Sequence, residues 1–358
     1  MRIGLNATCF DDRPSGANQR FRLLYGAVIR RNPQHAFIVY EPADHRIADW
    51  FAGSRNVVAC RTPLRGHGRI ARAAAGMQYW PRAWRKDALD LFEWFSLPVL
   101  RTPCRSMLTI HDLRSLHAVN PLERMVGKAV LHQAFRHADR IVAVSGVVRQ
   151  EIEAFHPGVR VSVVHNGVES KQFASDTGPE SEGFILAVGH IEARKNLGVL
   201  IAAIARLRDD GRRCRLVIAG RDGGMLGSIR AQVVALDVQD LVHIVEHADD
   251  VTVRALYAAC TLVVVPSTYE GFGIAVIEAM AAGRPLVTSD IAVFREITQA
   301  QGRYFPVNDP AAAAAAIEHV CTDPVERARL VAYGTARVRD FEFDRLADQL
   351  AALYVANA

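Results

Sequence analysis

Short runs of apolar, mostly β-branched residues alternate with longer amphipathic segments along most of the chain. Runs that are apolar throughout are typical of strands buried on both faces of a parallel sheet, and the amphipathic segments between them predict the covering helices. In the second half this pattern predicts a doubly wound α/β domain over residues 184–340. Its expected strands are 184–189, 215–220, 242–245, 261–267 and 284–290.

The first half follows the same pattern more loosely and predicts a second Rossmann-like domain over residues 1–168. Residues 169–183 are rich in Ser, Gly and acidic residues and have no hydrophobic period, so we expect an interdomain linker there. Residues 341–358 are expected to form a helix that packs back towards the first domain. The expected strands of that domain are 2–7, 36–41, 56–60, 106–112, 140–145 and 161–167, and its expected helices include 18–31 and 122–137.

Charge is distributed unevenly over the 358 residues, although the net charge is only +5. Residues 1–170 hold 24 Lys and Arg against 14 Asp and Glu, whereas residues 171–358 hold 19 against 24. The two halves are therefore expected to meet different partners, or different ends of one partner. No run of eighteen apolar residues and no signal-peptide pattern is present, so we expect a cytoplasmic protein.

The segment "STYEGFG" (267–273) follows an expected strand and precedes a helix that should begin near Gly273. Ligands of open parallel sheets bind at the carboxyl ends of the strands, where this loop lies. Gly271 and Gly273 let the backbone approach a ligand closely and offer N–H groups at the positive end of the helix dipole. The loop is therefore predicted to bind an anion through its backbone.

Two glutamates lie on either side of that expected anion site. Glu270 belongs to the loop and Glu278 to the second turn of the helix. Because the backbone contacts the anion, both carboxylates can accept hydrogen bonds from hydroxyl groups. A ligand with phosphates between two sets of hydroxyls is a nucleotide sugar. There is no D-x-D motif that would bridge a diphosphate through a metal ion, so no metal and no cofactor is expected.

The same residues carry a resemblance to a known family. Glu270-x7-Glu278, with its internal Gly-Phe-Gly, resembles the E-x7-E signature of the retaining family 4 glycosyltransferases. The segments "AVS" (143–145), "HNGV" (165–168), "AVGHIEARKNL" (187–197) and "IAG" (218–220) follow the order of that family, and the likeness covers roughly residues 1–340. The resemblance implies the GT-B fold, with two doubly wound Rossmann-like domains facing each other across a cleft.

What the resemblance implies for the second domain is a donor site. Arg194 and Lys195 would hold the donor diphosphate and neutralise the charge that develops on the leaving group. Glu278 would bind the ribose hydroxyls, and Glu270 would face the donor sugar. The remaining expected donor-binding residues are Gly189, at the end of a strand, and Gly271, Phe272 and Gly273, whose backbone would contact sugar and phosphate.

Two positions of the first domain complete the implied site. His111 lies near the end of the segment "SMLTIHD" (106–112), where the family often has a histidine near the transferred sugar. Gly16 lies where many members have two glycines before the first helix, whereas here Ser15 takes one of these places. The expected catalytic residues are His111, Arg194, Lys195 and Glu270.

The implied reaction is the metal-independent, retaining transfer of a hexose to a glycan or a lipid-linked oligosaccharide in surface polysaccharide synthesis. GDP-mannose is the expected donor, because "TIHDL" (109–113) resembles bacterial mannosyltransferases, with UDP-hexoses as the alternative. A nucleotide-sugar 2-epimerase, a phosphorylase and a non-catalytic nucleotide-sugar-binding protein remain open as alternatives. The segment "HIVEH" (243–247) matches an inverted zinc-protease motif, but it is expected to form a strand and so not to bind zinc.

Residues 61–86 hold seven Arg and Lys and no acid, interleaved with Tyr79, Trp80 and Trp84. This composition suits the headgroup layer of an anionic membrane, so a peripheral location on the inner face of the cell membrane is expected. Nucleic acid is not an expected partner, because no nucleic-acid-binding motif accompanies the segment. The alternative is a basic loop and helix whose tryptophans are buried in the domain.

Overall fold

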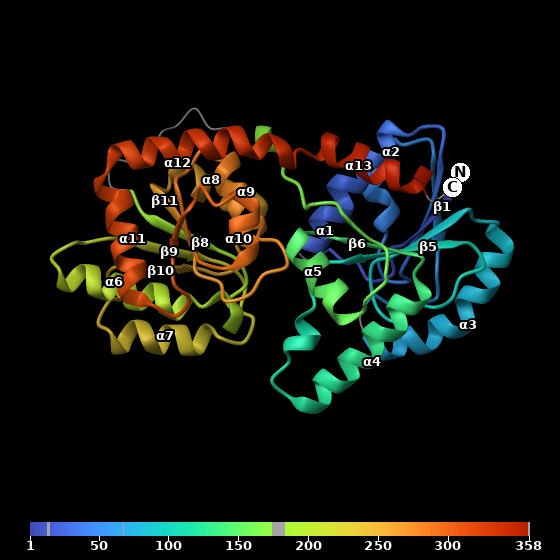
Figure 1. Cartoon of the computed structure of the whole chain (residues 1–358), viewed down its shortest axis with the longest axis horizontal. Helices are drawn as coiled ribbons and strands as arrows, with labels where there is room; N and C mark the ends of the chain where they lie inside the picture. The colour runs from blue at the N-terminus through green and yellow to red at the C-terminus, as the bar shows by residue number, and fades with distance from the viewer. Residues whose placement is uncertain (13–14, 67, 174–182, 357–358) are drawn as a thin grey trace. The chain divides into compact units, whose positions relative to one another are not determined.

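The computed structural model describes residues 1–12, 15–66, 68–173 and 183–356. The chain divides into two compact units, of which the first combines residues 1–167 with residues 343–358 and the second spans Val168–Glu342. Each unit is a parallel sheet covered by helices (Figure 1). Of the expected linker over 169–183, residues 174–182 lie outside the described residues.

The described sheet of the first unit has seven parallel strands in the order β3-β2-β1-β4-β5-β6-β7. The sequence did not predict β4, because Glu93 interrupts its apolar run. Glu93 is fully buried and accepts hydrogen bonds from Tyr25, Thr109 and Tyr354. The strands are β1 (Arg2–Asn6), β2 (Ala36–Glu41), β3 (Val57–Arg61), β4 (Leu91–Trp94), β5 (Arg105–Ile110), β6 (Arg140–Ala143) and β7 (Val161–Val163).

Helices on the first unit bury one apolar side against this sheet. The final helix α13 (Phe343–Ala356) is separated from the rest of its unit by the whole of the second, and it packs against α2. The other α-helices are α1 (Gly16–Arg20), α2 (Gly26–Arg31), α3 (Arg69–Asp87), α4 (Pro121–His137) and α5 (Gly146–Phe155). Shorter helical turns are η1 (Phe21–Tyr25), η2 (Ile47–Phe51) and η3 (Arg114–His117).

The described sheet of the second unit has six parallel strands in the order β10-β9-β8-β11-β12-β13. From β8, successive strands are added on one side up to β10 and on the other side from β11 onwards. The topological switch point therefore lies between β8 and β11, at the middle of the sheet. The strands are β8 (Ile185–Val188), β9 (Leu216–Ala219), β10 (Val242–Val245), β11 (Leu262–Val265), β12 (Leu286–Ser289) and β13 (Arg303–Phe305).

Both faces of the second sheet are covered, which explains why its central strands β8, β9 and β11 are apolar throughout. The α-helices are α6 (Leu197–Asp209), α7 (Leu226–Ala235), α8 (Asp250–Ala259), α9 (Ile274–Ala281), α10 (Ala292–Ile297), α11 (Pro310–Thr322) and α12 (Pro324–Arg337). Shorter turns are η4 (Ser170–Gln172), η5 (Ala193–Lys195) and η6 (Val338–Phe341).

The prediction that Trp80 and Trp84 settle at a membrane interface is wrong. Only 3% of Trp80 and 5% of Trp84 is exposed, and both rings pack edge-on against Phe92 and Trp94 of β4. Helix α3 therefore covers the sheet with its aromatic residues. Its two tryptophans are not exposed beside its exposed cations. No helix within the described ranges is long and apolar enough to cross a membrane.

Candidate active site

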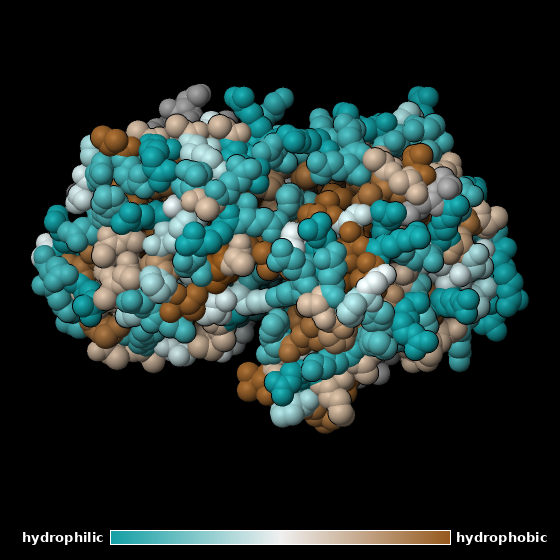
Figure 2. All heavy atoms as spheres, in the orientation of Figure 1, coloured by the Kyte–Doolittle hydropathy of each residue, from teal (hydrophilic) through white to brown (hydrophobic). Residues whose placement is uncertain are grey.

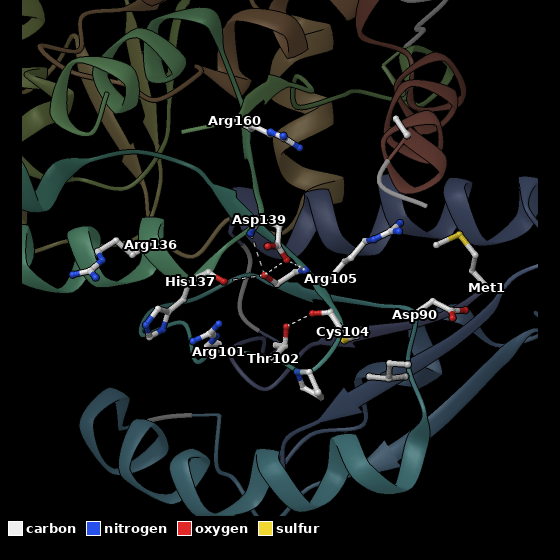
Figure 3. A pocket seen from close by; sticks show the side chains of 14 residues that line it. Met1, Asp90, Arg101, Thr102, Cys104, Arg105, Arg136, His137, Asp139 and Arg160 are labelled. Atoms are coloured by element: carbon white, nitrogen blue, oxygen red, sulfur yellow. Dashed lines mark hydrogen bonds between the residues drawn. The ribbon is translucent and has the colours of Figure 1, made fainter. Parts of the chain in front are cut away.

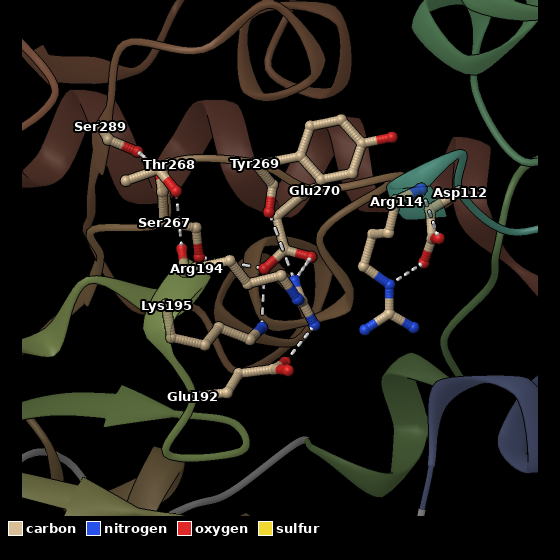
Figure 4. A network of polar contacts seen from close by, with 10 residues as sticks. All are labelled: Asp112, Arg114, Glu192, Arg194, Lys195, Ser267, Thr268, Tyr269, Glu270 and Ser289. Atoms are coloured by element: carbon tan, nitrogen blue, oxygen red, sulfur yellow. Dashed lines mark hydrogen bonds and ion pairs between the residues drawn. The ribbon is translucent and has the colours of Figure 1, made fainter. Parts of the chain in front are cut away.

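Two loops meet at the switch point of the second sheet. One follows β8 and carries Arg194 and Lys195; the other follows β11 and carries Glu270 (Figure 4). Strands β8 and β11 are hydrogen-bonded neighbours, so their carboxyl ends bring residues about 75 positions apart into contact. The expected carboxyl-edge site is therefore assembled from two segments that are distant in sequence.

Backbone hydrogen bonds hold the two loops together. The Thr268 N–H donates to the Arg194 carbonyl at 2.8 Å, and the Asn196 side-chain amide donates to the Pro266 carbonyl at 3.2 Å. Asn196 has a left-handed backbone with φ of 53° and directly precedes α6. These contacts fix the backbone that carries Arg194 and Lys195. The two side chains therefore extend from defined positions just before α6.

Glu270 is the centre of the polar network. Its carboxylate lies 2.7 Å from Lys195 Nζ and 2.5 Å from Arg194 Nη1, and it accepts a 3.0 Å hydrogen bond from Ser267 Oγ. Only 9% of its side chain is exposed. Burial raises the pKa of Glu270, but the charges of Lys195 and Arg194 and the hydrogen bonds outweigh it and hold the pKa below its usual value. Glu270 is therefore ionised at neutral pH.

A second carboxylate shares this network. Glu192 Oε1 lies 2.6 Å from Arg194 Nη2, so that Arg194 joins two acids. The sequence predicted separate roles for the cations and for Glu270, and it did not predict that they pair. The pairing also explains how two cations can precede α6 against its dipole, because the acids compensate their charge. Neither Glu192 nor Ser267 was recognised in the sequence, where both lie inside the quoted motifs without a distinctive spacing.

Two glycines let backbone and side chains pack closely beside Lys195. Gly189 follows β8 with φ of 138°, and a Cβ there would lie 3.1 Å from Lys195 Cε and Nζ. Gly220 follows β9, and a Cβ there would lie 1.9 Å from the Gly189 carbonyl oxygen. Any other residue at these positions would displace the loop. Gly189 was an expected donor-binding residue, and the structure places it against the Lys195 side chain.

The amino end of α9 lies next in the same loop. Gly273 has φ of 106°, and it provides no side-chain cap for the helix. A Cβ at this position would lie 2.7 Å from the Phe294 ring, so glycine is required by both conformation and space. Gly271 and Phe272 are buried, and Phe272 packs edge-on against Phe341 with 5.7 Å between ring centroids. Phe272 thus anchors the loop in the core of the unit.

Glu278 lies one turn further along α9 and is partly exposed. Tyr257 of α8 donates a hydrogen bond of 3.0 Å from its hydroxyl group to Glu278 Oε2. Tyr257 is fully buried, and burial together with the Glu278 charge raises its pKa well above the usual value, so the hydroxyl keeps its proton. The structure therefore adds Tyr257 to the site as a residue that orients Glu278. Nothing in the spacing around Tyr257 could have indicated this.

The two remaining predicted residues, Gly16 and His111, belong to the first unit. Gly16 begins α1, and Ser15 caps this helix by accepting a 3.1 Å hydrogen bond from the Asn18 N–H. The serine in place of a second glycine therefore has a structural reason. His111 directly follows β5, is partly buried, and has its pKa lowered to about 4 by burial and then by the charge of Arg20. It is neutral at pH 7.

The segment "HIVEH" does not form a metal site in the described chain. Its first residues form strand β10, as expected, and no group of three or more potential metal ligands occurs anywhere in the part of the chain that the structure describes.

A hollow of about 1340 Å³ lies at the opposite, amino-terminal edge of the first sheet (Figure 3). Its lining includes Asp139, which accepts hydrogen bonds from the backbone and side chain of Ser106. Helix α4 ends here at His137, and cations near a helix carboxyl end stabilise the helix dipole. Arg136 lies in the last turn of α4, where its charge favours the dipole, and the other arginines of the lining are Arg101, Arg105 and Arg160.

Comparisons with known proteins agree with this geometry. The family model "Glycosyl transferases group 1" matches residues 168–337, and the model "Glycosyltransferase Family 4" matches residues 14–172. A glycogen synthase of Mycobacterium tuberculosis is 30% identical over 295 residues, which cover 77% of this chain and 70% of the relative. A phosphatidyl-myo-inositol mannosyltransferase of the same species is 27% identical over 376 residues, which cover 99% and 96%.

Among solved structures, a sucrose-phosphate synthase from Thermosynechococcus elongatus superposes with a TM-score of 0.80 at 19% identity, covering 99% of this chain and 98% of that one. This likeness shows the fold. The two family models match the two units, one model for each unit. The chain therefore belongs to glycosyltransferase family 4, and it is a glycosyltransferase built from two Rossmann-like units of the GT-B fold.

Proposed function

We propose that the protein transfers a hexose to a glycan or a lipid-linked oligosaccharide. The first choice of donor is GDP-mannose, so that the hexose is mannose. The transfer retains the configuration of the anomeric carbon and needs neither a metal ion nor a cofactor. The observation that carries the proposal is the cluster of Lys195, Arg194 and Glu270 at the switch point of the second sheet. It provides two positive charges where ligands of open α/β sheets bind.

The two cations give the site its chemistry. A donor diphosphate between Lys195 and Arg194 competes with Glu270 for their charge, and it gains negative charge as the bond to the sugar breaks. Cations held in place at a partly buried position stabilise that developing charge without reorganising during the reaction. The amino end of α9 adds its dipole to the same effect. These groups do the work that a bridging metal does in other transferases.

The carboxylates determine how the donor is oriented. Glu278, held by Tyr257, accepts hydrogen bonds from the ribose hydroxyls, and Glu270 accepts them from hydroxyls of the sugar. A buried carboxylate that is paired with a cation keeps its acceptor oxygens ionised, which suits recognition of hydroxyl groups. In this arrangement Glu270 joins the sugar and the diphosphate sites.

The choice of donor is supported by the relatives but not by the geometry. The relative that matches nearly the whole chain is named a mannosyltransferase, which favours mannose. The glycogen synthase matches a smaller share of the chain. UDP-hexoses are the alternative donors that the sequence left open. Surface polysaccharide or glycolipid synthesis is the process that a mannosyl transfer to such acceptors would serve.

A donor screen with detection of the product tests the proposal. The purified chain is incubated with GDP-mannose, UDP-glucose and UDP-galactose, each with glycan and lipid-linked acceptors and with EDTA present. We expect one donor to be consumed only when acceptor is added, with retention at the anomeric carbon in the NMR spectrum of the product. An inverted product, or activity abolished by EDTA and restored by manganese, would contradict the proposal.

The same experiment separates the alternatives. A nucleotide-sugar 2-epimerase would convert the donor without acceptor, and a phosphorylase would absorb light near 400 nm through its cofactor. A non-catalytic nucleotide-sugar-binding protein would bind the donor without turnover. The family membership and the intact cluster of Glu270, Arg194 and Lys195 favour the transferase over these alternatives.

A further inference from the structure

The chain passes from one unit to the other twice, and the two connecting segments are paired. The first connection follows Gly167 and the second follows Glu342. Val168 forms a parallel bridge with Glu342, and its N–H donates a 2.9 Å hydrogen bond to the Phe341 carbonyl. We call residues 166–168 and 341–343 the connecting segments. Because a hydrogen bond joins them, a change in the backbone of one segment affects the other.

Phe341 ends the helical turn η6, directly before the second connection. It is fully buried, and its ring lies edge-on to the ring of Phe272 with 5.7 Å between the centroids. The Arg337 guanidinium lies over the same ring, 4.7 Å from its centroid. Arg337 is itself fixed, because its Nε donates to the Ile297 carbonyl at 2.8 Å and its Nη1 pairs with Asp340. The Phe341 ring therefore packs against both a loop residue and an anchored cation.

Phe272 joins this packing to the loop of the candidate site. It lies between Gly271 and Gly273, whose backbone is expected to contact the donor. These neighbours have no side chains, so Phe272 provides the side chain through which this part of the loop packs. Only 3% of Phe272 is exposed. The turn η6 also packs against α9, the helix that carries Glu278. Two parts of the candidate site are therefore in contact with η6.

The contact between Phe272 and Phe341 belongs to the interior of the second unit. Exposed apolar side chains gather elsewhere, for example at the amino end of α4, as Figure 2 shows. Closely packed interiors have low compressibility, so a displacement of one buried ring displaces its neighbour. A change in the loop is therefore passed to Phe341, whose backbone holds Val168.

We propose that Phe341 is a positioning residue that couples residues 267–273, the donor loop, to the connecting segments. Its ring acts on the loop through Phe272, and its carbonyl accepts the hydrogen bond from Val168. A ligand that fixes the donor loop should then slow the opening of the connecting segments. By reciprocity, a change in those segments should alter the affinity for the ligand. The effect on the donor rests on the proposed function, whereas the coupling itself needs no ligand.

Hydrogen exchange of the full chain without ligand tests the coupling. Mass spectrometry follows a peptide that contains the Val168 amide. We expect Phe272→Leu to raise the exchange rate of this amide at least about threefold, although Phe272 is not part of the connecting segments. Phe341→Leu should have a similar effect, and the double variant should add little, because both substitutions disrupt one contact.

The matched control is Phe305→Leu. Phe305 is a phenylalanine of the same unit that is 1% exposed, so its substitution has a similar cost in packing without touching the donor loop. Unchanged exchange of the Val168 amide in Phe272→Leu would overturn the proposal. An equal rise in Phe305→Leu would overturn it as well, because the effect would then be one of general destabilisation.

Nucleotide binding tests the effect on the donor. With GDP or UDP, calorimetry should show about threefold weaker binding in Phe341→Leu than in the parent and in Phe305→Leu. The bound nucleotide should slow exchange of the Val168 amide in the parent but not in Phe341→Leu, and equal slowing in both would overturn the coupling. Absence of nucleotide binding in the parent would contradict the proposed function, and the exchange of the chain without ligand would still decide the coupling.

Discussion

Lys195 Nζ lies 2.7 Å from Glu270 Oε1, and Arg194 contacts the other oxygen of the same carboxylate. One buried acid thus contacts both of the cations that we propose bind the donor diphosphate. The arrangement orients the cations, and under the proposed function it would make Glu270 a competitor of the diphosphate. The roles of the three residues can be separated by removing one charge at a time.

Removal of the Lys195 charge should mainly slow the chemical step. In Lys195→Ala the leaving diphosphate loses a positioned cation, which we expect to lower kcat by about 100-fold, with a smaller change in KM. Steady-state kinetics with the donor identified by the screen measure both parameters. Arg213→Ala is the control, because Arg213 is an exposed cation of the same unit that pairs only with Asp240 among the described residues. A change in KM alone would assign Lys195 to ground-state binding.

Neutralising Glu270 should separate diphosphate binding from turnover. Glu270→Gln keeps the size of the side chain and removes its charge, so Lys195 becomes available to a diphosphate, while Arg194 keeps its pairing with Glu192. A gain of about 1 kcal/mol in binding free energy from the freed charge corresponds to roughly fivefold tighter binding of GDP or UDP. Turnover should fall, because the amide no longer accepts hydrogen bonds as a carboxylate does. Isothermal titration calorimetry measures the binding, and unchanged affinity would refute competition.

Tyr257 should affect donor binding through Glu278. Tyr257→Phe deletes the hydroxyl that donates to Glu278 and should weaken donor binding by about 0.5–1.5 kcal/mol, with kcat nearly unchanged. Glu278→Ala should cost about 1.5–3 kcal/mol of donor affinity. If Tyr257 acts by orienting Glu278, the double variant should bind no more weakly than Glu278→Ala alone.

Tyr333→Phe is the control for this pair. It removes a hydroxyl from the same unit that donates to Gln299 at the surface. Donor affinity and kcat should both be unchanged in this variant. Additive losses in the double variant of Tyr257 and Glu278 would show that Tyr257 acts independently.

His111 predicts a defined pH dependence of stability. Its pKa is about 4 in the folded chain, against 6.5 for an ordinary histidine, because burial and Arg20 disfavour its charged form, with smaller effects from Asp112 and Arg114. Between these values the unfolded chain binds more protons than the folded one. The contribution of His111 to stability is therefore complete above pH 6.5 and is lost as the pH falls towards 4.

Urea unfolding between pH 4.5 and 8 measures this contribution. His111→Asn should reduce the slope of the unfolding free energy below pH 6.5 and leave it unchanged above. His117→Asn is the control, because His117 is an exposed histidine of the same unit. An equal reduction in both variants would contradict the assignment to His111.

Much of the fold was predictable, because burial on both faces imposes apolar runs on the strands. Strands β2 and β10 have the bounds expected from the sequence, and Gly273 precedes α9 as expected. Strand β4 was missed because Glu93 interrupts it, and an acid can only be accommodated there by partners that lie far away in sequence. A local pattern carries no information on such partners.

The candidate site was predictable as a set of residues but not as a set of contacts. The pairing of Lys195 with Glu270 depends on β8 and β11 being neighbours, which is a property of the sheet order. The tryptophans of α3 show likewise that a local sequence pattern does not determine contacts. An amphipathic helix with Trp80 and Trp84 looks alike in sequence whether these rings face a membrane or a sheet, and here they face the sheet.

Helix α13 also has a consequence for the order of events during synthesis. The ribosome makes residues 1–167 before the second unit, but Leu346, Leu350 and Tyr354, which complete the core of the first unit, are translated after it. Until then Glu93 lacks its Tyr354 partner, and the place of α13 is open to water. The second unit is continuous in sequence, so its core can form while the core of the first unit is still incomplete. The unit whose synthesis starts earlier is thus the unit that completes its folding later.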